Sequence, residues 1–155
     1  ATTTCGACVL NVQFRSFVPA DVLTVREKMA YTLTESTRGI VAYDTETSKT
    51  LAVFLAEGWT QNVAVVHQVI LKTMVLRHGW FEEIAGYMFT HAARKKLYTL
   101  VPSNHKKALS LNTKLGFKQI ARLEDAISDG VDNLVLELKR EDCKYWIQPK
   151  MQMVS

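Results

Sequence analysis

Residues 105–117 read His-Lys-Lys-Ala-Leu-Ser-Leu-Asn-Thr-Lys-Leu-Gly-Phe, and this stretch decides the fold. Ala108, Leu111 and Leu115 recur at helical spacing, so one face of the segment is apolar while its lysines point to water. Gly116 can supply the left-handed residue that ends a helix. The pattern therefore predicts an amphipathic helix with a sharp stop.

The sequence on either side of this helix predicts strands. Leu97–Val101 is short and apolar, and a proline follows it. Ser103 or Asn104 can cap the first turn of the helix. Beyond the glycine, Phe117–Ala126 and Asn133–Leu138 read as two further strands, joined by a turn at Ser-Asp-Gly.

The start of the chain predicts one strand followed by a helix. Cys8–Phe17 alternates polar and apolar residues, as a strand does. Pro19 and Asp21 suit the start of a helix, because proline is tolerated in a first turn and a carboxylate complements the helix dipole. The apolar stripe expected of that helix consists of Val22, Val25, Met29 and Leu33.

The middle of the chain predicts three strands and a long helix. Gly39–Tyr43 and Thr50–Trp59 are strand-like, with a polar connection between them. Asn62–Leu71 is β-branched and apolar, which is typical of a central strand. After a loop at Lys72–Gly79, the segment Trp80–Lys96 carries apolar residues every four positions and predicts a helix.

This order of elements, together with the final helix, resembles the GCN5-related N-acetyltransferase (GNAT) family, which often ends in Asn-x-x-Ala-x-x-x-Tyr-x-x-x-Gly-Phe. The chain keeps Ala108 and Gly116 before Phe117, but has His105 in place of Asn and Asn112 in place of Tyr. The resemblance implies an α/β (α+β) fold, with a mixed, mostly antiparallel sheet of six to seven strands flanked by helices. We expect a single domain over residues 1–155, with its core at about 8–140.

The resemblance also implies where a cofactor would bind. GNAT enzymes hold the pyrophosphate of acetyl-CoA with a Gln/Arg-x-x-Gly-x-Gly/Ala loop at the start of the long helix. Here Leu76 stands at the first position, Gly79 at the first glycine and Phe81 at the second. A phenylalanine there is expected to obstruct the phosphates, although Arg77 and His78 offer charge from neighbouring positions. The alternative is that Arg77 and His78 are surface loop residues and that Trp80 and Phe81 belong to the core.

Two residues are candidates for the base that acetyl transfer requires, Glu57 and His67 on adjacent predicted strands. Histidine has an ordinary pKa of about 6.5, which suits proton transfer. The alternatives are that His67 is a hydrogen-bonded core residue and that Glu57 ends a strand in water. Asn112, at the family's tyrosine position, cannot act as an acid.

The composition limits the classes of protein to which the chain can belong. The chain has 155 residues, 48% hydrophobic and 22% charged, which predicts one ordered domain. No apolar run approaches the roughly 20 residues of a membrane span, and no signal peptide is visible, so we expect a cytoplasmic site of synthesis. The net charge of +4 suits CoA phosphates, nucleic acid or an acidic protein. Lysine pairs at 95–96 and 106–107 carry part of that charge.

Cysteines give no complete metal site in the sequence. Cys5 and Cys8 form a Cys-x-x-Cys, which suits a metal knuckle or a redox pair. A zinc site needs four ligands, and Cys143 stands alone far away. We therefore expect free thiols and no metal.

The region 96–146 also resembles divergent GNAT-like proteins of tailed bacteriophages, through its Leu-Gly-Phe, Asp-Gly-Val-Asp and Arg-Glu-Asp-Cys segments. That resemblance, with Phe81 and Asn112 in place of family residues, favours a non-catalytic virion or assembly component that needs no cofactor and acts through protein contacts. The tail 143–155 is apolar, and residues 145–153 are a candidate contact with other virion proteins or a second copy. The alternative is an active acetyl-CoA-dependent N-acetyltransferase that acts on an amine.

Overall fold

The computed structural model describes residues 11–148, which contain a seven-stranded sheet with the order β1-β2-β3-β4-β5-β7-β6. Strands β4 and β5 pair in parallel, whereas β1–β2, β2–β3, β5–β7 and β6–β7 pair in antiparallel fashion. The strands are β1 (Val12–Ser16), β2 (Arg38–Asp44), β3 (Thr50–Glu57), β4 (Val63–Ile70), β5 (Lys96–Pro102), β6 (Lys118–Ser128) and β7 (Val131–Lys139). The predicted mixed, mostly antiparallel sheet flanked by helices is confirmed.

Seven helical segments accompany these strands within residues 11–148. They are η1 (Pro19–Asp21), α1 (Val22–Arg26), η2 (Thr73–His78), α2 (Trp80–Ala85), the π-helix η3 (Gly86–His91), α3 (Lys106–Leu115) and η4 (Arg140–Asp142). The chain forms two compact units. The first contains the described residues up to Glu57 together with His67–Trp80, and the second contains Gly58–Val66 together with the described residues from Phe81 onward.

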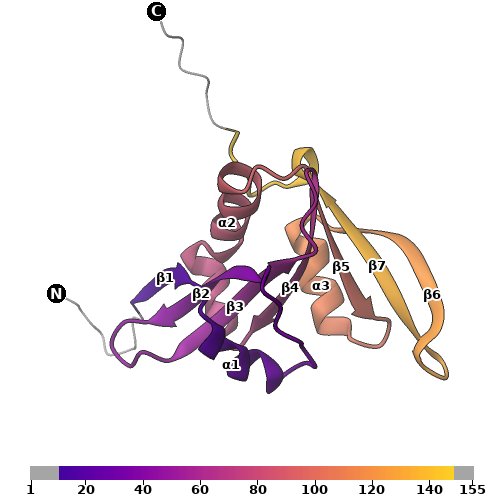
Figure 1. The fold of residues 1–155 in the computed structure, drawn as a ribbon, viewed down its shortest axis with the longest axis horizontal. Helices are drawn as coiled ribbons and strands as arrows, with labels where there is room; N and C mark the ends of the chain where they lie inside the picture. Colours follow the sequence, from indigo (N-terminus) through magenta and orange to yellow (C-terminus); the bar gives the residue numbers. More distant parts are fainter. Residues whose placement is uncertain (1–10, 149–155) are drawn as a thin grey trace, which may run out of the picture. The chain divides into compact units, whose positions relative to one another are not determined.

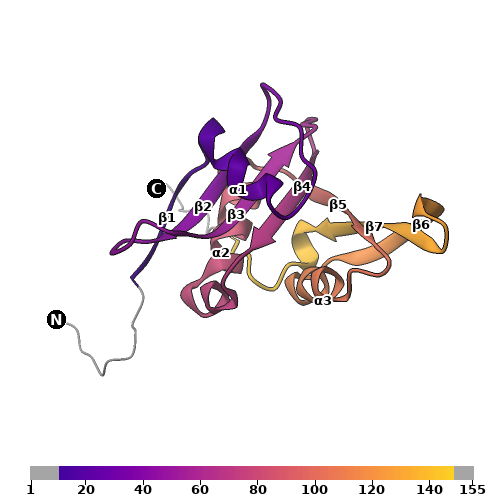
Figure 2. The same ribbon diagram turned by 90° about the horizontal axis from the view of Figure 1, so that it is seen from below.

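The first unit is built around an apolar cluster between α1 and the sheet. Figures 1 and 2 show α1 beside strands β2 and β3. Alternation along the strands places every second residue of β2, β3 and β4 on the same face. The buried members of the cluster are Val25, Val41, Val53, Leu55 and Val69, and Phe17, Met29, Tyr31 and Leu71 pack against them. This packing fixes the face on which the last residue of β3 and the middle of β4 present polar side chains.

The helix expected across Val22–Leu33 is much shorter than predicted. The α-helical part ends at Arg26, and residues 30–34 form neither helix nor strand. The segment from Tyr31 to Thr37 is rich in hydroxyl side chains, which bond to nearby backbone and side-chain groups and so compete with helix formation. Val25 and Met29 nevertheless pack on the cluster as predicted.

In the second unit, α3 lies on one side of β5 and β7 (Figure 2). Gly116 ends the helix with a φ of 122°, as the sequence predicted, and a Cβ there would lie 2.9 Å from Leu138 Cδ1. The predicted cap is wrong, because His105 is the N-cap and its Nδ1 accepts the N–H of Ala108 at 3.3 Å. The imidazole thus replaces the side-chain oxygen of a usual cap.

The long helix predicted for Trp80–Lys96 is interrupted and ends early. It begins as α2, widens into the π-helix η3 at Gly86 and ends at His91. The predicted stripe of Trp80, Ile84, Met88 and Ala92 is correct for its first three members, which are buried. Ala92 follows the end of the helix and is only partly buried.

The described part of the C-terminal tail packs on its own unit. The ring of Tyr145 meets Phe81 edge-on, with centroids 5.1 Å apart, and Trp146 meets Phe89 at 6.0 Å. Trp146 Nε1 also donates to Thr90 Oγ1 at 3.0 Å. The proposed contact through residues 145–153 stays a prediction, because residues 149–153 lie outside the described part of the chain.

Candidate functional site

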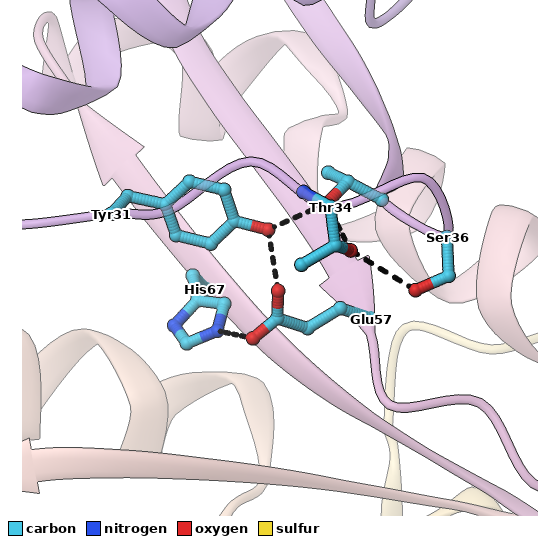
Figure 3. Close-up of polar contacts among 6 residues, drawn as sticks. Tyr31, Thr34, Ser36, Glu57 and His67 are labelled. Atoms are coloured by element: carbon cyan, nitrogen blue, oxygen red, sulfur yellow. Dashed lines mark hydrogen bonds and ion pairs between the residues drawn. The ribbon is translucent and has the colours of Figure 1, made fainter.

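The two residues predicted as bases lie side by side in the first unit. Glu57 is the last residue of β3 and His67 lies in the middle of β4. His67 Nε2 is 3.2 Å from Glu57 Oε1 (Figure 3), and the side chains are 19% and 26% exposed. Both therefore remain reachable from solvent while their geometry is held by the sheet.

Tyr31 completes this cluster. Its hydroxyl donates to Glu57 Oε2 at 2.7 Å, and its ring meets that of His67 edge-on with centroids 5.4 Å apart (Figure 3). Thr37, which is buried, lies 2.9 Å from the same hydroxyl. Sequence analysis missed Tyr31, because the predicted helix ran through it. The available signal was the row of Thr and Ser residues that follows it, which favours a loop with side-chain bonding.

The environment of Tyr31 keeps its phenol protonated. Burial, followed by the hydrogen bond to Glu57, raises the pKa of Tyr31 from 10.0 to about 12. Both causes disfavour the phenolate, the first because a charge loses hydration and the second because a neighbouring carboxylate repels it. Tyr31 therefore donates to Glu57 throughout the neutral pH range.

This shift predicts a loss of stability at alkaline pH. Between pH 10 and pH 12 the unfolded chain has released the Tyr31 proton while the folded chain still holds it. Because the unfolded state then binds fewer protons, the free energy of unfolding falls as pH rises through this window. Urea unfolding at pH 8, 10 and 11 is expected to show a shallower decline for Tyr31→Phe than for the unmodified chain. If the free energy of unfolding falls equally with pH in both proteins, Tyr31 does not titrate differently in the folded and unfolded states.

The residues predicted to hold a cofactor lie at the end of η2. Arg77 and His78 are exposed, and neither side chain makes a hydrogen bond or an ion pair with another residue of the described part. Gly79 follows with a φ of 86° and a ψ of 23°, in the left-handed region that favours glycine. Two donor side chains beside a turn into α2 fit a phosphate-bearing group.

Phe81 is a core residue of the second unit, which was the alternative to a ring that obstructs the loop. Its side chain is 2% exposed and packs on Tyr145 in the second unit. The residue after the glycine turn begins a helix, and helical geometry directs Phe81 into the core of its own unit. Its size is therefore no argument against a phosphate beside Gly79.

Glu82 and Glu83 lie in the first turn of α2, in the second unit, where their carboxylates complement the helix dipole. Within residues 11–148, no cluster of three or more His, Cys, Asp and Glu side chains is arranged to hold a metal ion. The Cys5–Cys8 pair lies outside the described residues.

Asn112 occupies the position where the resemblance implied a tyrosine. It is buried, and its Nδ2 donates to the carbonyl of Ala108 at 2.9 Å. The amide is thus used within α3.

Comparison with solved structures settles the fold. The spermidine/spermine N-acetyltransferase SpeG from Vibrio cholerae, solved with manganese ions, matches with a TM-score of 0.68 and 14% identity, covering 84% of this chain and 93% of that one. The same enzyme in complex with CoA and spermine matches with a TM-score of 0.68 and 13% identity, covering 84% and 96%. The chain has the GNAT fold. No family model and no curated protein sequence matches it.

These neighbours correct our expectation of a non-catalytic virion component. The neighbours compared above are spermidine N-acetyltransferases, and one structure holds CoA and spermine. The comparison thus favours the alternative of an acetyltransferase, and the expectation that no cofactor is needed finds no support. The bacteriophage origin and virion location are not shown either. No helix within residues 11–148 is long and apolar enough to cross a bilayer.

Proposed function

We propose that this chain is an acetyl-CoA-dependent N-acetyltransferase whose acceptor is a primary amine. The observation that carries the proposal is the pairing of His67 with Glu57 at 3.2 Å, in a chain with the GNAT fold. Acetyl transfer to an amine needs a group that removes a proton from the ammonium form of the acceptor. An imidazole that is partly exposed and held by a carboxylate is suited to that task.

His67, Glu57 and Tyr31 have separate roles in the proposed reaction. His67 accepts the proton of the acceptor amine, and the carboxylate of Glu57 stabilises the imidazolium that results. Tyr31 holds the second oxygen of Glu57, so the carboxylate keeps its orientation. Acetyl-CoA, when bound, would supply the acetyl group as a thioester, whose C–S bond breaks as the acceptor nitrogen bonds to the acetyl carbon, with the second proton of the amine leaving on the CoA thiolate. Asn112 supplies no proton in this scheme, because its amide is bound within α3.

Arg77, His78 and Gly79 are the residues that would hold the phosphates of acetyl-CoA. Arg77 offers a guanidinium, which matches phosphate oxygens, and the ring nitrogens of His78 offer further contacts. Gly79 lets the chain turn tightly beside them.

Cofactor binding provides a direct test. The double variant Arg77→Ala with His78→Ala is expected to bind CoA about 10–100-fold more weakly, because charge-assisted hydrogen bonds are lost. Isothermal titration at constant ionic strength measures the loss.

The matched control is the double variant Lys106→Ala with Lys107→Ala, which removes two exposed cations from α3. If it weakens CoA binding as much as the loop variant does, the effect reflects overall charge and the assignment of the phosphate site is wrong. Unchanged CoA affinity in this control supports the assignment of the phosphate site to Arg77 and His78.

Activity is tested with acetyl-CoA and a panel of amines, with CoA release as the readout. Spermidine and spermine are the first acceptors to assay, because the structural neighbours are named for them. Amino sugars and the amino groups of peptides complete the panel. Binding of acetyl-CoA without turnover of any amine would contradict the proposed function.

A further inference from the structure

A row of hydroxyl groups leads from the surface to Glu57 in the first unit (Figure 3). Tyr31 bonds to Thr37 at 2.9 Å, Thr37 to Thr34 at 3.1 Å, and Thr34 to Ser36 at 3.1 Å. Thr37 is buried, whereas Thr34 and Ser36 are exposed. The row therefore runs from solvent, through a buried hydroxyl, to the carboxylate.

The carboxylate fixes the direction of every bond in this row. An ionised carboxylate can only accept, and a hydroxyl has one proton to donate. The Tyr31 proton goes to Glu57 Oε2 at 2.7 Å, so Tyr31 must accept from Thr37. By the same step, Thr37 accepts from Thr34, and Thr34 accepts from Ser36.

This one-way arrangement strengthens the bond at its end. Hydrogen bonds that point the same way polarise one another, so the phenol of Tyr31 is a better donor than an isolated one. The raised pKa of Tyr31, about 12, agrees with a phenol that keeps its proton beside a carboxylate. The backbone N–H of Thr34 also donates to Thr37 Oγ1 at 3.2 Å, which anchors the row to the loop.

The ionised carboxylate of Glu57 then decides which ring nitrogen of His67 carries the proton. Because Glu57 Oε1 can only accept, the proton between the two side chains must lie on His67 Nε2. In the neutral ring, the lone pair is then on Nδ1. Nδ1 makes no hydrogen bond with another residue of the described part, so it is the nitrogen left to accept a proton.

We propose that Ser36, Thr34, Thr37 and Tyr31 are positioning residues, whose one-way row of hydrogen bonds holds Glu57 as an acceptor and so presents Nδ1 of His67 as the base. The proposal rests on the proposed acetyltransferase function for its catalytic meaning. The proton taken from the acceptor ammonium forms a bond to Nδ1, and the amine keeps the electron pair. The imidazolium that forms is paired with the Glu57 carboxylate.

The test combines nitrogen NMR of the His67 ring, at a pH where the ring is neutral, with kinetics of the same variants. In the unmodified protein the ring proton is expected on Nε2. In Tyr31→Phe and in Thr37→Val, exchange of that proton with water is expected to speed up about 10-fold, because Glu57 is held less firmly. The value of kcat is expected to fall about 10-fold with KM for acetyl-CoA unchanged.

Two further variants separate positioning from general loss of structure. Thr37→Ser keeps the hydroxyl and is expected to restore the values of the unmodified protein. Tyr98→Phe removes a similar phenol–carboxylate bond, from Tyr98 to Glu137 at 2.8 Å in the second unit, and is expected to leave the His67 ring signals unchanged. Circular dichroism checks that each variant is folded.

The outcomes are distinguishable from those of the proposed function. A proton on Nδ1 of the neutral His67 ring in the unmodified protein, or ring signals that do not respond to Tyr31→Phe and Thr37→Val, would overturn the positioning role. Equal effects in Thr37→Ser and Thr37→Val would also overturn it. If no amine is acetylated, the proposed function fails, while the NMR experiment still decides whether the row orients His67.

Discussion

The variant His67→Gln is expected to lower kcat for acetyl transfer by about 10²–10⁴-fold, the usual range for loss of a general base. A glutamine side chain can still bond to Glu57, so the fold of the first unit is retained, but an amide does not take up a proton at neutral pH. The affinity for acetyl-CoA, measured by titration, is expected to stay within about twofold, because the base acts on the acceptor. Single-turnover kinetics at saturating acetyl-CoA measure the loss directly.

The same substitution at other histidines provides the controls. His91→Gln changes an exposed residue of η3 and is expected to leave both kcat and affinity as they were. His78→Gln alters the phosphate loop, so it is expected to weaken acetyl-CoA binding more than it lowers kcat. Retention of full kcat in His67→Gln would rule out His67 as the base.

Glu57→Gln provides a second test of the same pair. Removal of the charge leaves the imidazolium without its carboxylate partner, and an amide holds the His67 ring less strictly in one tautomer. We expect kcat to fall by about 10²-fold or more, again without loss of cofactor binding. Unchanged kcat in Glu57→Gln would mean that Glu57 is only the last residue of β3 and has no role in acetyl transfer.

The strands were predictable because burial imposes a simple period on them. Thr50–Glu57 and Val63–Ile70 were both located to within two residues, since each is a β-branched, apolar run with polar residues at its ends. Placing Glu57 and His67 on adjacent strands followed from that. Their contact did not follow, because the register between two strands cannot be counted from the sequence.

The helices were harder to predict. Hydrogen bonds of side chains to nearby groups ended them earlier than the helical spacing of apolar residues indicated. Met29 and Leu33 continued a helical stripe, yet the chain leaves the helix after Arg26 and turns its hydroxyl groups toward one another and toward Glu57. The capping histidine of α3 was missed for a related reason. Ser103 and Asn104 are better caps in general, but the strand continues to Pro102 and the helix begins only at Lys106.

Phe81 shows why a substitution at one position of a family motif is weak evidence that a binding site is blocked. The sequence places a large ring where the family has a glycine, which suggests a blocked site. The structure turns that ring into the core, where Tyr145 covers it. Only the direction of the Cα–Cβ bond distinguishes the two cases, and that direction depends on the turn at Gly79.

The largest effect on stability is expected from Gly39→Ala in β2. Gly39 pairs with Leu55 of β3, and a Cβ at Gly39 would lie 1.9 Å from the carbonyl oxygen of Phe54. Because that atom belongs to the backbone of the neighbouring strand, the two strands must separate to make room. We expect a loss of about 3 kcal/mol or more in the free energy of unfolding, at the upper end of overpacking effects.

The matched control is Gly86→Ala, which adds the same methyl group at the start of η3, where a Cβ would have no atom within 4 Å. Alanine is favoured over glycine in helical segments, so this variant is expected to gain up to about 1 kcal/mol. Urea unfolding followed by circular dichroism compares the two. Similar midpoints would show that β2 and β3 can move apart at little cost. A large loss in Gly39→Ala alone would show that the β2–β3 pairing is rigid, and β3 is the strand that carries Glu57 to His67.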